Sequence, residues 1–404
     1  MQSDLQVPYH RPSIGDEEIN EVVSTLRSGW LTTGPKTAQF EREFSSYADV
    51  PHALAVNSCT SGLHLALAAL NIGPGMEVIT TPLTFCATVN TIIHTGATPV
   101  LADVGPDGNI DPASIAARIT DKTRAIVPVH FAGLPCDMQA IWFLARRHGL
   151  DVIEDCAHAA GALCNGRHAG ASDALTGEHS AAAVFSFYAV KNLTTGEGGM
   201  VLTHDEELAS RMKILSLHGI SKNAWNRYSD RGHWGYEVLE PGFKYNMGDI
   251  QASIGIHQLR KLEGFIEART RFAELYNALL ADVEEVELPA TKTDCRHAWH
   301  LYTLRLNLDR LEIGRDEFIE QLRERGVGTS VHFIPIPLHP FFASRAQLRQ
   351  NRVPKALELY PRLISLPLFP AMTESQVEYV ANAVRQIARK SCKKHRMAMA
   401  VAGD

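Results

Sequence analysis

Apolar and polar positions alternate in a regular order along the first half of the chain. Apolar runs with the length of buried strands lie at 77–80, 99–103, 125–130, 151–155, 182–187 and 200–204. Between them, apolar residues recur at helical spacing in 36–48, 61–71, 84–95, 111–119 and 137–148. Continuous apolar strands that alternate with amphipathic helices are typical of a mainly parallel sheet with helices on both faces. The pattern therefore predicts an α/β fold.

Helical patterns flank this region on both sides. Residues 14–27 predict a first helix, with Asp16 as its N-cap and Gly29 at its end. One face of this helix carries Ile19, Val22, Val23 and Leu26. A second helical pattern runs from Asp249 to about residue 282, and a helix of that length commonly links two domains.

The pattern changes after the long helix. A strand is predicted at 301–306 and helices near 315–325 and 373–389, which together indicate a smaller α+β unit. We therefore expect a division into three parts. They are a large domain over residues 1–248, the linking helix with a small C-terminal domain over 249–390, and a tail over 391–404 that frays.

Composition agrees with a globular protein of two domains. The 404 residues are 45% hydrophobic and 21% charged, which is enough apolar material for a large core. The net charge of -6 is modest, and no basic block favours nucleic acid or a membrane surface. The first residues are polar and contain no apolar leader segment, so we expect a cytoplasmic protein.

Two stretches without charged residues are candidates for membrane spans. Residues 53–76 and 78–102 contain no Asp, Glu, Lys or Arg. Both are interrupted by Asn, Ser, Thr, His and Pro, and neither holds ~20 consecutive apolar residues. We therefore interpret them as buried core elements.

The cysteines do not form a recognisable framework. They include no C-x-x-C pair, their number is odd, and several lie in apolar runs, which favours reduced, buried thiols in a cytosolic protein. The chain also lacks a His-Glu-x-x-His motif, so we expect no metal. The residues concerned are Cys59, Cys86, Cys136, Cys156, Cys164, Cys295 and Cys392.

Three segments of the α/β region carry residues suited to chemistry. In the first, Asn57-Ser-Cys-Thr-Ser61 leads directly into a helical run. The unpaired N–H groups at the start of a helix favour an anion, so Thr60 and Ser61 are candidates to hold a phosphate. A simple helix cap explains the same residues, and such caps are common.

The second segment ends the predicted strand at 151–155. It places Asp155 at the carboxyl edge of the sheet, where the ligands of open α/β sheets bind. A carboxylate there suits a cationic ring nitrogen or a metal, although a strand-end Asp that caps the next turn is the simpler alternative. His158, taken alone, is interpreted more simply as a partly buried histidine than as a ligand.

The third segment places Lys191 in an otherwise uncharged stretch. An apolar strand ends at Ser186-Phe187, and the Gly-rich sequence after the lysine lets the backbone pass close to another group. Most lysines are solvated on the surface, but this one lacks the charged neighbours of a surface face. A desolvated lysine has a lowered pKa, which imine formation requires.

The three segments together indicate a cofactor site more strongly than any one of them does alone. Pyridoxal phosphate needs a cradle for its phosphate, a carboxylate for its pyridine nitrogen and an amine for its aldehyde, and the segments supply them in that order. The competing nucleotide motifs are absent, because there is no Gly-Lys pair for a P-loop and no G-x-G-x-x-G after a strand. The sequence therefore predicts a pyridoxal-phosphate enzyme in which Lys191 carries the cofactor as an imine.

These residues resemble the sugar aminotransferase family named after DegT, DnrJ, EryC1 and StrS, which has the fold of aspartate aminotransferase (type I of the pyridoxal-phosphate enzymes). The resemblance runs from about residue 8 to residue 390. The segments that carry it are 29–35, 57–61, Thr84-Phe85, 154–158, 186–191, 196–199, 244–247 and Val331-His332.

The resemblance implies a role for each matching residue around the cofactor. Lys191 would form the internal imine, and Asp155 would pair with the pyridine nitrogen. Phe85 would stack on the cofactor, and His158 would lie near its ring and phenolic oxygen. The phosphate ligands would be Thr60, Ser61 and Ser186.

The resemblance also implies a homodimer with shared active sites, because Asn246 would reach the phosphate of the partner subunit. His332 lies in a segment near the sugar site of the family. One departure is Tyr188, where many relatives have His.

The implied substrates are L-glutamate as amino donor and a nucleotide-linked keto sugar as acceptor. The segment 237–247 resembles relatives that act on 4-keto sugars. Some relatives have His in place of the lysine and dehydrate sugars, so Lys191 favours amino transfer. The alternatives left open are a dehydratase of the same family, a cofactor-binding regulator without turnover, and a structural partner without cofactor.

Overall fold

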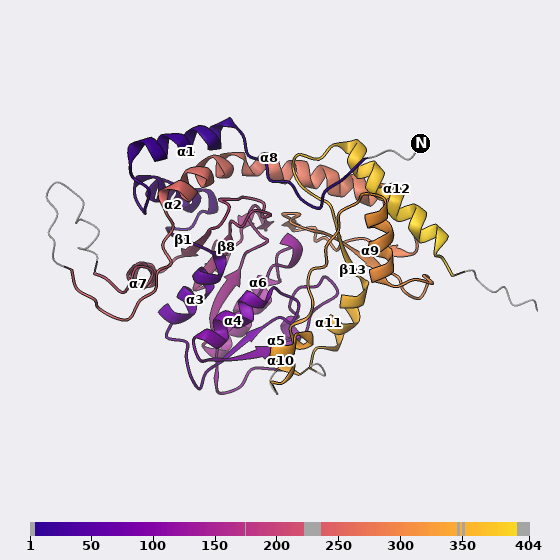
Figure 1. Ribbon diagram of the computed structural model, residues 1–404. Coiled ribbons are helices and arrows are strands. Elements are labelled where there is room, and N and C mark those ends of the chain that lie inside the picture. The colour runs from indigo at the N-terminus through magenta and orange to yellow at the C-terminus, as the bar shows by residue number, and fades with distance from the viewer. Residues whose placement is uncertain (1–4, 174, 222–235, 346–347, 350–351, 394–404) are drawn as a thin grey trace, which may run out of the picture.

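The fold, seen in a computed structural model, is built around a seven-stranded sheet (Figure 1). The structure describes residues 5–173, 175–221, 236–345, 348–349 and 352–393. The strand order is β1-β9-β8-β5-β4-β2-β3, and only the pairs that involve β9 are antiparallel. The strands are β1 (His52–Val56), β2 (Glu77–Thr80), β3 (Thr98–Leu101), β4 (Thr123–Val127), β5 (Asp151–Asp155), β8 (Ala182–Ser186) and β9 (Gly199–Thr203).

Helices cover both faces of this sheet, which confirms the predicted fold class. Side chains that alternate along a strand enter different cores: Val184 packs with α3 and α7, whereas Phe185 packs with α2 and α8. The helices of the first face are α3 (Cys59–Ala69), α4 (Cys86–His94) and α7 (Glu206–Leu215). The helices of the second face are α2 (Pro35–Ala48), α5 (Pro112–Ala116), α6 (Met138–His148) and α8 (Asp249–Leu280).

The C-terminal part is the expected smaller α+β unit. Its three-stranded sheet has the order β10-β12-β13, and α9 and α12 share its core. Val7 also pairs with Val327 and lies in this core, so the N-terminal residues pack with the small unit. The elements are β10 (Val286–Glu287), β12 (Tyr302–Leu306), α9 (Arg315–Glu324), η3 (Ile336–Leu338), α10 (Pro340–Ala343), α11 (Pro354–Leu359), η6 (Tyr360–Arg362), β13 (Leu363–Leu366) and α12 (Glu374–Lys390).

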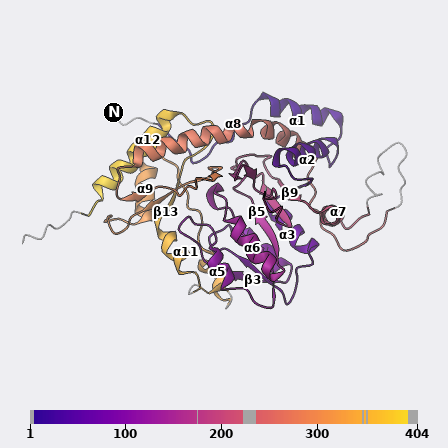
Figure 2. The ribbon, with the colours of Figure 1, turned by 180° about the vertical axis from the view of Figure 1, so that it is seen from behind.

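The long helix α8 links the two units, as Figure 2 shows from behind. Its first half packs in the core of the large unit through Ile256 and Leu262, and its second half packs in the small core through Phe272 and Tyr276. No helix among the described residues is long and apolar enough to cross a membrane.

The first helix, α1 (Asp16–Ser28), differs from the prediction in two ways. Its N-cap is Gly15 rather than Asp16, because the Glu18 carboxylate accepts the Gly15 N–H at 2.8 Å. Its apolar face is also exposed, with Ile19 at 52% and Leu26 at 50%. Glu18 is buried instead, since it pairs with Lys261 and accepts from Gln258 on α8.

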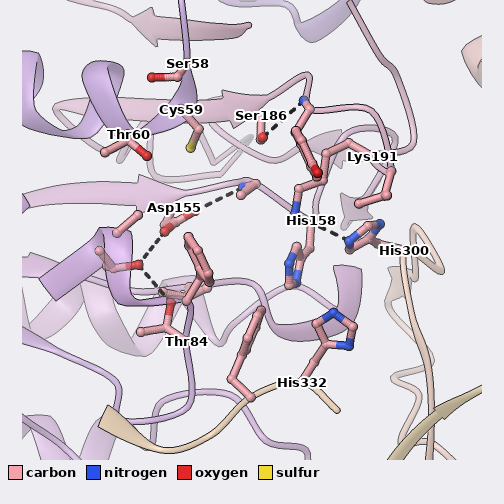
Figure 3. A pocket seen from close by; sticks show the side chains of 18 of the residues that line it. Ser58, Cys59, Thr60, Thr84, Asp155, His158, Ser186, Lys191, His300 and His332 are labelled. Atoms are coloured by element: carbon pink, nitrogen blue, oxygen red, sulfur yellow. Dashed lines mark hydrogen bonds between the residues drawn. The ribbon is translucent and has the colours of Figure 1, made fainter. Parts of the chain in front are cut away.

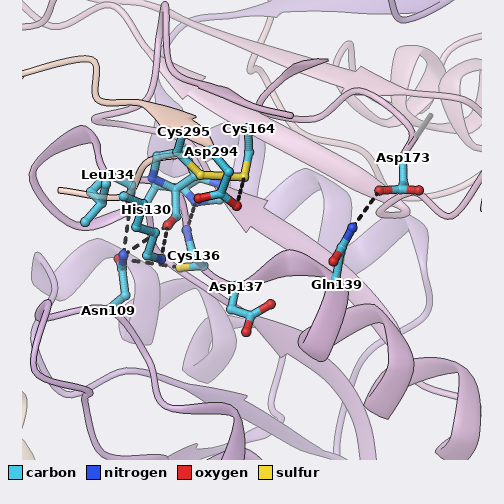
Figure 4. The surroundings of a disulfide bond; sticks show 12 residues. Asn109, His130, Leu134, Cys136, Asp137, Gln139, Cys164, Asp173, Asp294 and Cys295 are labelled. Atoms are coloured by element: carbon cyan, nitrogen blue, oxygen red, sulfur yellow. Dashed lines mark hydrogen bonds between the residues drawn. A yellow bond between two sulfur atoms is a disulfide. The ribbon is translucent and has the colours of Figure 1, made fainter. Parts of the chain in front are cut away.

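The prediction for the cysteines is wrong for two of the seven. Cys164 on β6 (Leu163–Cys164) and Cys295 on β11 (Cys295–Arg296) form a disulfide (Figure 4). The two residues are antiparallel partners 131 positions apart, with Cα atoms 4.1 Å apart, so no sequence spacing could show the pairing. The hairpin strand β7 (Arg167–His168) completes this small sheet. The other five cysteines are free as predicted, but Cys86 and Cys392 are only partly buried.

The expected fraying tail lies mostly outside the described residues. Its first part is anchored, because the Ser391 carbonyl accepts the Glu312 N–H and the Lys393 N–H donates to the Arg310 carbonyl. Residues 394–404 fall beyond the described part of the chain.

Asp249 ties the first turn of α2 to the long helix. Its fully buried carboxylate accepts hydrogen bonds from the N–H groups of Gly34, Lys36 and Thr37, at 2.8 to 3.0 Å, and from the Thr37 hydroxyl. The N-cap of α2 is Gly34, which has no side chain to cap the helix. Asp249 therefore supplies the cap from a residue far away in the sequence.

We predict that Asp249→Ala lowers the free energy of unfolding by about 3 kcal/mol or more, because buried N–H donors lose a charged acceptor. Chemical denaturation measures this. The matched control is Asp205→Ala, which removes the exposed cap of α7 from Glu207 and Leu208 and should cost about 1 kcal/mol. Equal losses for the two variants would contradict the anchoring role of Asp249.

Candidate active site

The predicted chemical groups meet at one edge of the central sheet. Asp155 ends β5 and Ser186 ends β8, and these two strands are parallel neighbours. Val56 at the end of β1 lies opposite Gly199, which also pairs with Ser186. The start of α3 follows β1, so it arrives at the same edge.

Gly199 allows the start of α3 to approach the sheet closely. A Cβ atom at this position would lie 2.7 Å from the Phe185 carbonyl oxygen and 2.8 Å from the Cys59 nitrogen. Both distances are shorter than van der Waals contact, so a side chain here would push α3 away from the sheet. The Gly-rich segment noted in the sequence therefore serves close packing beside the site.

A pocket of about 500 Å³ opens at this edge (Figure 3). Most of the predicted site residues line it, and the exceptions are Ser61 and Asn246. Among the described residues of the lining, Lys191 is the only lysine or arginine. The predicted residues that line it are Thr60, Phe85, Asp155, His158, Ser186, Lys191 and His332.

The amine of Lys191 points into the pocket. Its Nζ lies 3.5 Å from Nε2 of His300, a residue that sequence reasoning missed. Burial lowers the pKa of Lys191 to about 8, although the nearby Cys59 and Asp155 offset part of the shift. A substantial fraction of the amine is therefore neutral near physiological pH, which a nucleophile or base requires.

Asp155 is the buried carboxylate of the pocket. Its oxygens accept hydrogen bonds from the Thr88 hydroxyl at 2.8 Å and from the Ala157 N–H at 3.1 Å. Burial raises the pKa of Asp155, while these hydrogen bonds and the charge of Lys191 act in the opposite direction. A cationic partner would stabilise the charged form in this setting.

The start of α3 provides the expected place for an anion. Ser58 is the N-cap and accepts the Ser61 N–H at 3.1 Å, while the Ser61 hydroxyl donates to Asn57 at 2.6 Å. Ser61 is thus turned toward the cap and does not line the pocket. Thr60 lines the pocket from the first turn of the helix, and Ser186 lines it from the end of β8.

Aromatic and imidazole rings form the rest of the wall. His158 is buried, its ring stacks on Phe333 with centroids 5.6 Å apart, and its Nδ1 has no partner among the described residues. His332 stacks on Tyr9 at 5.9 Å, and its Nδ1 lies 2.8 Å from the Ser365 hydroxyl. Phe85 is 61% exposed, a large apolar surface that faces the pocket.

Asn246 lies outside this pocket. Its amide nitrogen donates to Thr33 at 2.7 Å, and its buried Oδ1 has no partner among the described residues. It borders a separate surface hollow together with Leu31 and Gly248. Within one chain, Asn246 therefore does not line the pocket of Lys191.

Several lining residues carried no recognisable signal in the sequence. His300 precedes β12, Tyr9 lies near the N-terminus, and Thr88 lies within α4. None stands in a Gly-rich turn or at the end of a parallel strand. Only the helical spacing in 84–95 pointed to Thr88, because it places Thr88 one turn after Thr84. The hydroxyls of the two residues lie 2.8 Å apart.

The pocket fits pyridoxal phosphate in its donor set. It offers a half-buried amine of lowered pKa, a buried carboxylate, hydroxyls at a helix start, and an exposed aromatic face. The buried Nδ1 of His158, which has no partner among the described residues, is a further polar atom in the wall of this pocket. Fold and site together define a pyridoxal-phosphate enzyme of fold type I.

Comparison with known proteins agrees with this class. The model of the DegT/DnrJ/EryC1/StrS aminotransferase family matches residues 12–385. The chain is 49% identical over 385 residues to the spore coat polysaccharide biosynthesis protein SpsC of Bacillus subtilis, a match that covers 95% of this chain and 97% of SpsC.

Solved structures show the same relationship. Spr1654 of Streptococcus pneumoniae, assigned as a sugar aminotransferase, is 33% identical in its PMP-form with a TM-score of 0.88, covering 95% of this chain and 99% of that one. It is also known in a PLP-form. DesV of S. venezuelae, in complex with a ketimine intermediate, is 34% identical with a TM-score of 0.85, covering 95% and 98%.

The chain belongs to the DegT/DnrJ/EryC1/StrS aminotransferase family. It has the fold of the sugar aminotransferases, and its cofactor is pyridoxal 5'-phosphate. The resemblance noted in the sequence is thereby confirmed for family, fold class and cofactor.

We predict that Lys191→Met stabilises the cofactor-free protein at pH 7. The folded-state pKa of about 8 lies below the unfolded value of 10.5. Burial of the charged amine therefore lowers the free energy of unfolding of the wild type below pH 8, and this loss disappears as the pH rises to 10.5. The free energy of unfolding should rise by about 2 kcal/mol in the variant. This is less than the full pKa shift of Lys191 implies, because the pocket admits water. Thermal unfolding at pH 7 and pH 10 measures it.

The control for this prediction is Lys191→Arg, which keeps a positive charge in the pocket. This variant should show no gain at pH 7. A gain that is equal at both pH values would mean that packing, and not the charge of Lys191, causes it.

Proposed function

We propose that the protein transfers an amino group from L-glutamate to a nucleotide-linked keto sugar, with the keto group at the 4-position. The observation that carries the proposal is the amine of Lys191, held in the same pocket as the buried carboxylate of Asp155. The name of SpsC, a polysaccharide biosynthesis protein, supports a sugar as the acceptor. Lysine at position 191, where dehydratases of the family have histidine, favours transfer.

Lys191 is the proposed proton carrier. When bound, pyridoxal phosphate supplies an electron sink that stabilises the charge left on a substrate carbon after a proton leaves. The neutral amine takes that proton at Nζ and holds it as an ammonium before releasing it. With a pKa of about 8 the ammonium is the main form near neutral pH, but the neutral amine is within reach, so the group can both take up and release a proton.

The other residues bind and orient the cofactor in this proposal. Asp155 holds a proton at the ring nitrogen through its carboxylate, and Thr88 and Ala157 keep that carboxylate in place. Thr60 and Ser186 bind the phosphate beside the start of α3, whose N–H groups favour an anion. Ser61 contributes by capping that helix, rather than from the pocket lining.

Rings on both sides enclose the reacting groups. Phe85, the N-cap of α4, would cover the cofactor, and His158 would lie near its ring and phenolic oxygen. His332 and Tyr9 form the wall where the sugar binds, and Tyr188 borders the opening. Uncharged imidazoles and aromatic faces suit a sugar ring, which offers hydroxyls and C–H groups.

The active unit in this proposal is a homodimer. The exposed apolar face of α1 continues through Trp30 and Leu31, which are 40% and 48% exposed, toward the hollow that contains Asn246. Monomeric proteins rarely leave so many large apolar side chains together in water. A second copy on this face would bring Asn246 to the phosphate of the other subunit, where an N–H of its amide would donate.

We predict that the Ile19→Asp, Leu26→Asp double variant weakens the dimer at least about tenfold, because two charges replace buried apolar contacts. Light scattering coupled to size exclusion measures the dissociation, and wild type should have twice the 44.5 kDa of the chain. Phe143→Asp is the matched control, since Phe143 is 51% exposed on α6, outside this face. A monomeric wild type, or a control as weak as the double variant, would contradict the proposed interface.

We predict that the protein aminates a nucleotide-linked 4-keto sugar in the presence of L-glutamate, and that Lys191→Ala lowers the rate by at least about a thousandfold. A panel of nucleotide keto sugars is incubated with glutamate, and the product mass is read. Replacement of the keto oxygen by an amino group identifies transfer. Loss of water without gain of nitrogen would identify a dehydratase, and a cofactor band that glutamate leaves unchanged would indicate a regulator.

A further inference from the structure

His300 forms a side-chain contact with the amine of Lys191, although the sequence did not suggest it. It comes from the segment between β11 and β12, and Figure 3 shows its ring facing Lys191 across the pocket. The distance from Nζ to Nε2 is 3.5 Å. The histidine is only 5% exposed, so water does not compete freely for this contact.

The backbone of His300 is held firmly. The buried guanidinium of Arg269, on α8, donates from Nη1 to the carbonyls of Trp299 at 3.0 Å and His300 at 3.4 Å. On the other side, the Leu301 N–H donates to Ala132 at 3.2 Å. These contacts fix the direction in which the imidazole leaves the backbone.

The same segment is tied directly to the chain around Lys191. The side-chain amide of Asn192, the next residue after the lysine, donates to the Ala298 carbonyl at 2.8 Å. The Ala298 N–H donates to the Gly133 carbonyl of η1 (Phe131–Gly133) at 2.9 Å. The lysine and the histidine therefore keep their relative position through short, buried hydrogen bonds.

The imidazole of His300 is neutral in this setting. Burial lowers its pKa well below the usual value, and the charge of Lys191 lowers it further. The His158 ring, 4.4 Å away between centroids, occupies its other side. The Nδ1 of His300 has no hydrogen-bond partner among the described residues, and in the tautomer protonated there Nε2 keeps a free lone pair that can accept from the amine.

We propose that His300 is a positioning residue for Lys191, whose neutral imidazole accepts a hydrogen bond from Nζ, sets the direction of the amine and favours its protonated form. The inference rests on the proposed role of Lys191 as the residue that carries the cofactor. The other titratable groups that act on Lys191 or on His300 are Cys59, Asp155, His158, Arg269 and His332.

The experiment titrates the visible absorption band of the holoprotein between pH 6 and pH 10, which follows protonation at the nitrogen that joins Lys191 to the cofactor. In His300→Phe the acceptor is lost and the protonated form is less favoured, so the transition should move down by about one pH unit. In His300→Gln a carbonyl oxygen replaces Nε2, and the transition should stay within about 0.3 unit of wild type. His300→Leu replaces the Phe variant if that protein does not fold.

The matched control is His297→Phe. His297 is buried in the same segment and stacks on Trp299 with centroids 4.0 Å apart, but it does not line the pocket. Its loss should lower the unfolding temperature without moving the absorption transition. A shift in this control as large as that in His300→Phe would assign the effect to general loosening of the segment and overturn the proposal.

Two further outcomes separate this inference from the proposed function. Borohydride reduction of the holoprotein followed by peptide mass analysis should place the label on Lys191. Label on another lysine would contradict the proposed function itself. Label on Lys191, with a titration in His300→Phe within about 0.3 unit of wild type, or with His300→Gln shifted as far as the Phe variant, would overturn only the role of His300.

Discussion

The amine of Lys191 shares its pocket with a buried carboxylate, and much of the structure serves to keep that arrangement in place. A charged ammonium without compensation costs several kcal/mol in a protein interior. Asp155 offsets part of this cost, and burial shifts the remaining balance toward the neutral amine. The two side chains share one pocket because β5 and β8 are parallel neighbours that end at the same edge, and Lys191 follows the end of β8.

The sheet edge alone does not complete the pocket. His300, His332 and Tyr9 enter it from the C-terminal part of the chain and from the N-terminal residues that pack with it. Arg269 holds the backbone of His300 from the long helix, and the disulfide between Cys164 and Cys295 fastens the start of the same segment to the large unit. The small unit thus contributes the wall that faces the amine.

The sequence predicted most elements that position the site. The strands that end at Asp155 and Ser186 and the helix that begins after Asn57 lie close to their predicted bounds, because each is a local apolar pattern with a clear end. β1 and α7 were missed. β1 is a strand of only five residues, and α7 follows directly on the strand β9. The family, the fold class and the cofactor also followed from residues in local motifs.

Other features depended on residues far apart in the sequence. The exposed face of α1 could not be inferred from its apolar spacing, because Glu18 is drawn inward by Lys261 on a helix more than two hundred residues later. The same holds for the cysteine pair, whose members are separated by 131 residues. Ser61 fits the phosphate motif in sequence, but the geometry of the cap turns its hydroxyl toward Asn57.

The sequence by itself determined that this protein holds a lysine, an aspartate and a helix start in the order that pyridoxal phosphate requires, because strand ends and helix starts are encoded by neighbouring residues. Only the tertiary structure decided what surrounds the amine. His300 is 109 residues from Lys191, and its contact arises from the packing of two units, which leaves no trace in local spacing. The cofactor could therefore be predicted from the sequence, whereas the side chains that surround Lys191 could not.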